Sequence, residues 1–182
     1  MHVTEAQHEV RHTFRGGFAG QLVSGVLWLV SAGFATWGSF RHAVIVLVVG
    51  GFFIFPLTQL TLRLLGGPHS LSRENPLNGL GMQVAFVLPL MLPLVGAATL
   101  YRLDWFYPAF MIALGAHYQP FVFLYGMRMF GVLAGILVAG GVALGLYIET
   151  APSAGAWLTG VVLLVFAVAG RAVVRSEDAL AT

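Results

Sequence analysis

The sequence contains no cysteine and no lysine, and charged residues of either sign are scarce. Only 9% of its 182 residues are charged, whereas about 25% is usual for a soluble domain, so the chain lacks the charge to cover a water-exposed surface. The absence of cysteine excludes disulfides, thiolate metal sites and cysteine nucleophiles. The basic side chains are all arginines, which are scattered singly, so no nucleic acid partner is expected.

The few charges divide the chain into six long uncharged windows of 20 to 27 residues each. About 20 apolar residues suffice for a helix to cross the hydrocarbon core of a bilayer. The run 44–49 does not alternate as a barrel strand would, so helices are predicted. The expected fold class is all-α, a polytopic transmembrane helix bundle with six spans. The predicted helices are 18–39, 43–64, 77–101, 105–127, 129–148 and 154–174.

The arginines also predict the orientation of the chain in a cell membrane (inner or plasma membrane). If the N-terminus is cytoplasmic, seven arginines lie in cytoplasmic segments and only Arg41 and Arg102 lie in outer loops, which is the usual positive-inside bias. Both termini are therefore predicted to be cytoplasmic. An amphipathic segment, 1–17, precedes the membrane domain, 18–174, and a tail, 175–182, follows it. The first window is too long for the apolar region of a cleaved signal peptide, about 7–15 residues.

Prolines and glycines distinguish the predicted helices from one another. Prolines inside the second, third and fourth helices are expected to kink them and to free carbonyls that face protein or water. The fifth helix instead has glycines four residues apart, which let backbones approach closely and offer a face for an oligomer. These prolines are Pro56, Pro89, Pro93 and Pro120, and these glycines are Gly131, Gly135, Gly141 and Gly145.

A faint internal repeat is also present. Gly51, Pro56 and Arg63 of the second helix recur at similar spacing as Gly115, Pro120 and Arg128 of the fourth. One interpretation is three helical hairpins in tandem. The alternative is that such matches arise by chance in apolar sequence, and that the prolines only shape the bundle.

Several short motifs resemble a family of small bacterial multi-pass membrane proteins of unknown function. The motifs are Leu22-Val-Ser-Gly25 with Trp28, Phe55-Pro-Leu57 with Leu62-Arg-Leu64, Glu74-Asn-Pro-Leu-Asn78, and His117-Tyr-Gln-Pro-Phe121. Together with the segment between them they cover about half of the chain. The resemblance implies a six-helix integral membrane architecture, and it implies no activity and no cofactor.

Polar side chains within the windows are the candidates for a site, because polar groups in a membrane are costly and tend to face the bundle interior. His117 falls near mid-membrane, where an imidazole can bind a ligand or relay a proton. The resulting hypothesis is a transporter or channel-like protein for a small molecule or ion, with a mid-membrane polar cavity. The residues expected to line this cavity are His117, Gln119, Tyr125, Gln59, Thr58, Gln83 and Asn78.

A structural role explains the same residues equally well. His117 would then donate to a carbonyl freed by Pro56 or Pro120, near Phe52 or Ala116, and the glutamines would join helices. The protein would be a structural or partner-binding subunit without transport, or a lipid-binding protein. The chain has no P-loop, no dinucleotide-binding glycine motif and no G-x-S-x-G, so no cofactor is predicted.

The third alternative is a membrane zinc metallopeptidase. His8-Glu-Val-Arg-His12 matches H-E-x-x-H, in which both histidines share a helix face and Glu9 would act as general base on a metal-bound water. A catalytic site also needs a third protein ligand and a cleft. His69 and Glu74 are the candidates for that ligand. The competing interpretation is a short interfacial helix with Glu–Arg and Glu–His pairs.

Overall fold

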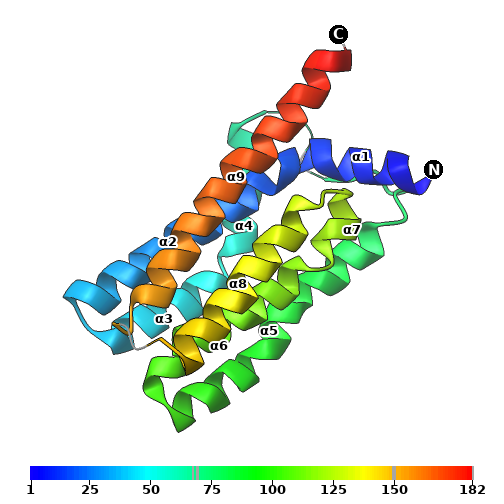
Figure 1. Cartoon of the computed structure of the whole chain (residues 1–182). Helices are drawn as coiled ribbons and strands as arrows, with labels where there is room; N and C mark the ends of the chain where they lie inside the picture. The colour runs from blue at the N-terminus through cyan, green and yellow to red at the C-terminus, as the bar shows by residue number, and fades with distance from the viewer. Residues whose placement is uncertain (67, 69, 149–150, 182) are drawn as a thin grey trace.

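The computed structural model describes residues 1–66, 68, 70–148 and 151–181, and every regular element within these ranges is helical. Figure 1 shows a bundle of long helices with the short helix α1 lying across one end. The elements are α1 (Val3–Thr13), η1 (Arg15–Gly17), α2 (Phe18–Trp37), α3 (Phe40–Gly51), α4 (Ile54–Leu64), α5 (Asn78–Tyr101), η2 (Leu103–Trp105), α6 (Phe106–Tyr118), α7 (Phe121–Tyr125), α8 (Met129–Leu146) and α9 (Ala154–Ala181).

Four of these helices are long and apolar enough to cross a membrane. They are α2 with the preceding turn, α5, α8 and α9, and the bent pair α3–α4 adds a fifth candidate. The predicted fourth helix, 105–127, is divided into α6 and α7 by a break at Gln119 and Pro120. All six predicted windows therefore contain helix, and length and composition support four or five candidate spans.

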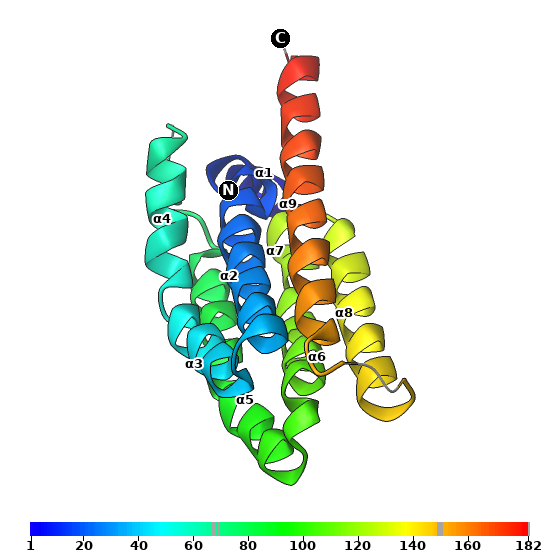
Figure 2. The same ribbon diagram turned by 90° about the vertical axis from the view of Figure 1, so that its left-hand side faces the viewer.

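Helix α9 is longer at its C-terminal end than the predicted helix 154–174. It runs on to Ala181 and projects beyond the rest of the bundle (Figure 2). The predicted helix ended just before Arg175, but residues 175–181 are mostly good helix formers, so the helix continues out of the apolar region.

One end of the bundle, here the α1 end, gathers segments that are distant in sequence. The side chain of Gln7 donates to the Phe123 carbonyl oxygen of α7 at 2.6 Å. The Ser72 backbone N–H donates to the carboxylate of Glu9, so the loop before α5 also lies here. Arg15 joins the end of α4 to this assembly by donating to the Leu65 carbonyl oxygen at 2.9 Å.

The opposite end gathers the other connections. Trp157 Nε1, near the start of α9, donates to Thr36 Oγ1, near the end of α2, at 3.0 Å. A hollow at this end is lined by both Arg102 and Tyr147, so the α5–α6 and α8–α9 connections lie together. The helical segments α2, α3–α4, α5, α6–α7, α8 and α9 therefore run alternately from one end to the other.

The bend between α3 and α4 has a local cause in the backbone. The two helices meet at 61° around Phe52 and Phe53, whose N–H groups bond to carbonyls three residues earlier. Pro56 has no N–H to offer the Phe52 carbonyl, which is four residues before it, so the regular ladder is interrupted there. The kink expected at Pro56 is therefore present, whereas α5 runs unbroken through Pro89 and Pro93.

Glycines set the distance between packed helices. A Cβ on Gly170 of α9 would lie 2.3 Å from the Gly16 carbonyl oxygen, so the backbones of η1 and α9 are in direct contact. In the same way, a Cβ on Gly115 of α6 would lie 2.8 Å from the carbonyl oxygen of Ala134 in α8. Among the glycines predicted to face a second molecule, Gly131, Gly141 and Gly145 face α6 or α7 of the same chain, and Gly135 has nothing within 4 Å.

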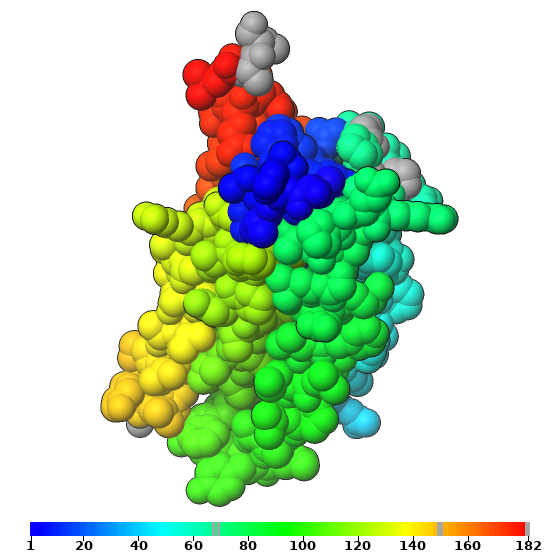
Figure 3. Space-filling view, turned by 90° about the vertical axis from the view of Figure 1, so that its right-hand side faces the viewer, coloured from blue at the N-terminus to red at the C-terminus, as the bar shows by residue number. Residues whose placement is uncertain are grey.

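The core lies where α2, α6, α8 and α9 meet. Its largest fully buried side chains include Trp28, Tyr107 and Phe130. Ser31 of α2 shares a 2.8 Å hydrogen bond with the Tyr107 hydroxyl and donates to the Ala43 carbonyl oxygen of α3 at 2.9 Å. By contrast α5 packs mainly on α6 and covers an outer face of the molecule (Figure 3).

Candidate functional site

A cavity of about 390 Å³ lies between α2, α4, α5, α6 and α7. This volume is within the usual range for small-molecule sites, about 300–1,000 Å³. Its wall is mostly apolar. The apolar lining residues include Phe14, Phe52, Ile54, Phe55, Leu62, Val84, Leu88, Leu114, Phe121 and Phe130.

Three polar side chains in this wall have buried atoms without a hydrogen-bond partner among the described residues. They are Gln21, with both its amide nitrogen and its amide oxygen, Thr58, with Oγ1, and His117, with Nδ1. Gln21 is only 2% exposed. Leaving a buried polar group unpaired costs about 1–3 kcal/mol. These atoms come from three different helices, and all three residues line one space, so a polar group held in the cavity would satisfy them together.

The structure brings four of the seven predicted lining residues to this cavity: His117, Thr58, Gln59 and Tyr125. Gln119, Gln83 and Asn78 are exposed and are not among its lining residues. Gln119 follows His117 by two residues, and each helical residue turns by about 100°, so the two side chains point in nearly opposite directions. Asn78 instead donates to the Ser72 carbonyl oxygen at 2.7 Å and closes the loop before α5.

His117 uses neither of the two acceptors that the structural alternative assigned to it. Its ring lies against the backbone of Val84 in α5 rather than against the carbonyl of Phe52. The Ala116 carbonyl oxygen accepts from the backbone N–H of Gln119 at 3.3 Å. A histidine side chain on α6 therefore reaches across to α5, and its Nδ1 is left for the cavity.

The cavity lining predicted from the sequence leaves out Gln21, Ser24 and Tyr118, which also line the cavity. Gln21 and Ser24 are three residues apart and both are buried on α2. Polar residues at this spacing share one helix face, and this signal was present in the sequence.

The chemistry of the cavity favours a neutral amphipathic molecule. Its described lining residues include amide, hydroxyl and imidazole groups but no Asp, Glu, Lys or Arg. The walls around this polar group are phenylalanine and aliphatic side chains. An apolar tail with one polar head that both donates and accepts hydrogen bonds would match both parts of the wall.

The H-E-x-x-H segment forms part of α1, as the sequence predicted, but its glutamate faces the loop before α5. Glu9 accepts hydrogen bonds from the Ser72 hydroxyl at 3.1 Å and from Asn75 Nδ2 at 2.9 Å, besides the Ser72 N–H. The bond from the Ser72 backbone is the main reason why the pKa of the Glu9 carboxyl lies below its ordinary value. Both Glu9 oxygens are thus engaged away from any metal-bound water, which does not favour the peptidase.

The two histidines of this segment do lie together. Their ring centroids are 4.0 Å apart, as expected for residues four apart on a helix. Of the two predicted third ligands, His69 lies outside the described residues, and Glu74 is exposed on the loop. The acidic side chain that the structure brings to His8 and His12 is Glu177 of α9.

Comparison with known proteins places the chain in a family but gives no activity. No curated protein and no solved structure matches it. The family of unknown function DUF7010 matches residues 3–172, which is nearly the whole chain. Because this match spans far more than half of the chain, the chain belongs to that family.

Proposed function

We propose that the chain is a multi-pass protein of the cell membrane that holds a small, neutral amphipathic molecule in the cavity between α2, α4, α5, α6 and α7. One observation carries this proposal: three helices present polar atoms, without a partner in the described part of the chain, to a cavity whose remaining wall is mostly apolar. A transmembrane chain tolerates such atoms when they face a cavity rather than lipid.

We include six membrane crossings in this proposal, whereas helix length and composition support at most five candidate spans. The segment α6–α7 starts beside the α8–α9 connection and ends at Arg128, where α8 begins. Helix α8, with 18 residues, returns over the same distance and is a candidate span. Together α6 and α7 therefore cover the length of a span although their helix is broken, and both termini fall on one side, proposed to be the cytoplasm.

The molecule would reach the cavity from the lipid. In the most apolar stretch of helix α5, only 11% of the residues are buried inside the protein. The cavity wall also includes Phe52 and Phe55 of the α3–α4 segment, whose side chains are 66% and 69% exposed. Cavity wall and lipid-facing surface thus share residues. A long-chain alcohol or a similar lipid has the required apolar tail and neutral polar head.

Tryptophan quenching by a dibrominated long-chain alcohol tests the binding. Trp28 is 2% exposed and lines a smaller hollow of about 80 Å³, which shares Ser24, Gly51 and Leu114 with the cavity. A variant with Phe at the other three tryptophans, reconstituted in lipid nanodiscs, would report on this space alone. We expect quenching that saturates with the alcohol.

Matched variants give the test its specificity. Gln21→Leu removes the unpaired amide but keeps the volume, and we expect about tenfold weaker binding, the scale of one hydrogen bond. Gln83→Leu changes an exposed glutamine outside the lining and should bind as the parent does. Quenching that rises linearly without saturation, or that Gln21→Leu leaves unchanged, would refute the proposal.

Transport of the same molecule is the second candidate function. It is favoured by the break between α3 and α4, since Gly51, Phe52 and Ile54 at this break line the cavity, and transporters commonly use broken helices at their substrate sites. A fluorescent long-chain alcohol in the inner leaflet of vesicles would then become accessible to an external quencher faster when the protein is present. Equal rates with and without protein would leave binding without transport.

A further inference from the structure

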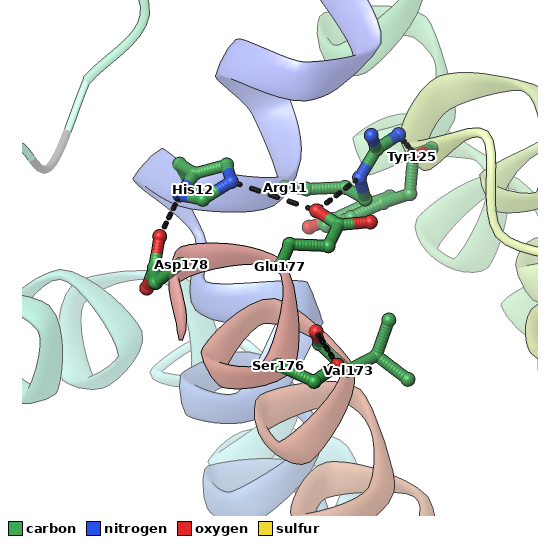
Figure 4. A network of polar contacts seen from close by, with 7 residues as sticks. All are labelled: Arg11, His12, Tyr125, Val173, Ser176, Glu177 and Asp178. Carbon is green, nitrogen blue, oxygen red and sulfur yellow. Dashed lines mark hydrogen bonds and ion pairs between the residues drawn. The ribbon is translucent and has the colours of Figure 1, made fainter. Parts of the chain in front are cut away.

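A second cluster of functional side chains lies outside the cavity, where α1 meets the last turns of α9 (Figure 4). His8 and His12 of α1 and Glu177 of α9 each offer one ligand atom, and these atoms all lie within 4.8 Å of one another. The ring centroids of His8 and His12 are 4.0 Å apart, and the ring planes are tilted by 30° relative to each other. The cluster therefore joins the N-terminal helix to the C-terminal helix.

The contacts of His12 with two carboxylates indicate which ring nitrogen faces this cluster. Its Nδ1 lies 3.1 Å from an Asp178 carboxylate oxygen, so Nδ1 is placed to donate to Asp178. Its Nε2 is buried, has no hydrogen-bond partner among the described residues, and lies 3.5 Å from Glu177 Oε2. Histidines that bind a metal through one ring nitrogen commonly donate the other ring N–H to a carboxylate, which holds the ring in place.

Glu177 is also held in place from the side. Arg11 Nε donates to Glu177 Oε2 at 3.2 Å, and Arg11 Nη1 donates to the Tyr125 carbonyl oxygen at 2.8 Å. Among the described residues, the ion pairs and hydrogen bonds of Glu177 all use Oε2. Its Oε1 is the atom that a metal would take, with Arg11 supporting the carboxylate from the other side.

We propose that His8, His12 and Glu177 bind a divalent transition metal of the zinc class, which clamps α1 to the end of α9. Two imidazole nitrogens and one carboxylate oxygen are a donor set that zinc accepts, and three protein ligands leave a fourth position to water. Small closing movements bring the ligand atoms to about 2.0–2.2 Å from a shared ion. The site is a clamp rather than a peptidase centre, because Glu9 is bound to Ser72 and Asn75.

Zinc titration of the full-length protein in detergent, by calorimetry near neutral pH, tests this site. The affinity tag must contain no histidine. We expect one zinc per chain and a higher melting temperature with zinc than without it. Cobalt chloride should give the visible absorption bands of a four-coordinate cobalt ion in the same stoichiometry.

Two variants remove single ligands at little cost to the fold. His8 is exposed, so His8→Gln should fold normally and bind zinc at least about tenfold more weakly, since even changes behind the ligands cost about 10–100-fold. Glu177→Gln should show the same loss. His42→Gln, an exposed histidine at the start of α3, is the matched control and should bind zinc as the parent does.

Three results would each overturn the site. The first is a parent protein that binds no zinc at micromolar concentration. The second is unchanged zinc affinity in both His8→Gln and Glu177→Gln. The third is an equal loss in His42→Gln, which would mean that scattered surface histidines bind the ion.

Discussion

Two glycines determine how closely the start and the end of the chain can approach. Gly170 in α9 has ordinary helical geometry, yet a Cβ there would stand 2.3 Å from the carbonyl oxygen of Gly16. Gly16 itself has a φ of 65°, between Arg15 and Gly17, which also have positive φ. The contact joins backbone to backbone, so no flexible side chain can move aside to relieve it.

Gly170→Ala is therefore expected to destabilise the protein by about 1–3 kcal/mol, the usual cost of overpacking. The extra methyl must push α9 away from η1 over the whole crossing. The control is Gly135→Ala in α8, where a Cβ would meet nothing within 4 Å. Thermal melting in detergent compares the two variants, and equal melting temperatures would mean that α9 and η1 can separate enough to accept the methyl group without cost.

Single residues also show where the sequence was informative about the site. His117 and Thr58 were found because polar groups stand out against an apolar helix. Gln119 and Gln83 stand out equally but are exposed. Distinguishing the two pairs requires the rotation of each helix about its axis, which depends on packing against neighbours and not on the composition of a window.

At the level of elements, the bend between α3 and α4 shapes one wall of the cavity. The bend arises because Pro56 cannot donate to Phe52, and residues on both sides of the break line the cavity. Straightening this segment would move α4 relative to α2, against which it packs. The shape of the cavity thus depends on a single missing backbone donor.

Pro56→Ala is expected to reduce the 61° bend. A straight helix over this segment would be about 36 Å long, and the bend shortens its end-to-end distance by about 5 Å. Spin labels on cysteines introduced at Arg41 and Leu64 measure this distance directly, because the chain has no cysteine of its own. Pro152→Ala, in the α8–α9 connection, is the control and should leave the distance unchanged. No lengthening in Pro56→Ala would mean that packing against α2, rather than the proline, holds the bend.

The positions of the helices could be predicted from the sequence, but their exact ends and their packing partners could not. The uncharged stretches of the sequence predicted the position of every long helix. Such stretches are informative because a helix that crosses a bilayer needs about 20 apolar residues in a row, which few soluble folds contain. The extension of α9 past residue 174 was missed because a charge ends a window without ending a helix. Which helices pack together was also beyond the sequence, since α2 packs most closely on α9 and α6 on α8, and no composition rule links these pairs.

At the level of the whole molecule, the alternation of helix direction predicts a complete topology. Reporter fusions after Ser39, Leu103 and Pro152 should report the outside of the cell. Fusions after Ser70, Arg128 and Thr182 should report the cytoplasm, in agreement with seven arginines inside and two outside. Opposite results at any two of these positions would refute the six-span arrangement. If α6–α7 enters and leaves on one side, the fusion after Leu103 should still report the outside, whereas the fusions after Arg128, Pro152 and Thr182 should all be reversed.

The pairing of α2 with α9 also has a consequence for how the protein is made. These are the first and the last long helices, and 116 residues separate the end of α2 from the start of α9. At a synthesis rate of about 5–20 residues per second, α2 waits for about 6–23 s before its main partner leaves the ribosome. During that interval the face of α2 that carries Gly25, which packs against Gly160 and Leu164, has no α9 to cover it. A nascent chain that stops before α9 would leave this face uncovered, so α2 reaches its full packing only after α9 has been made.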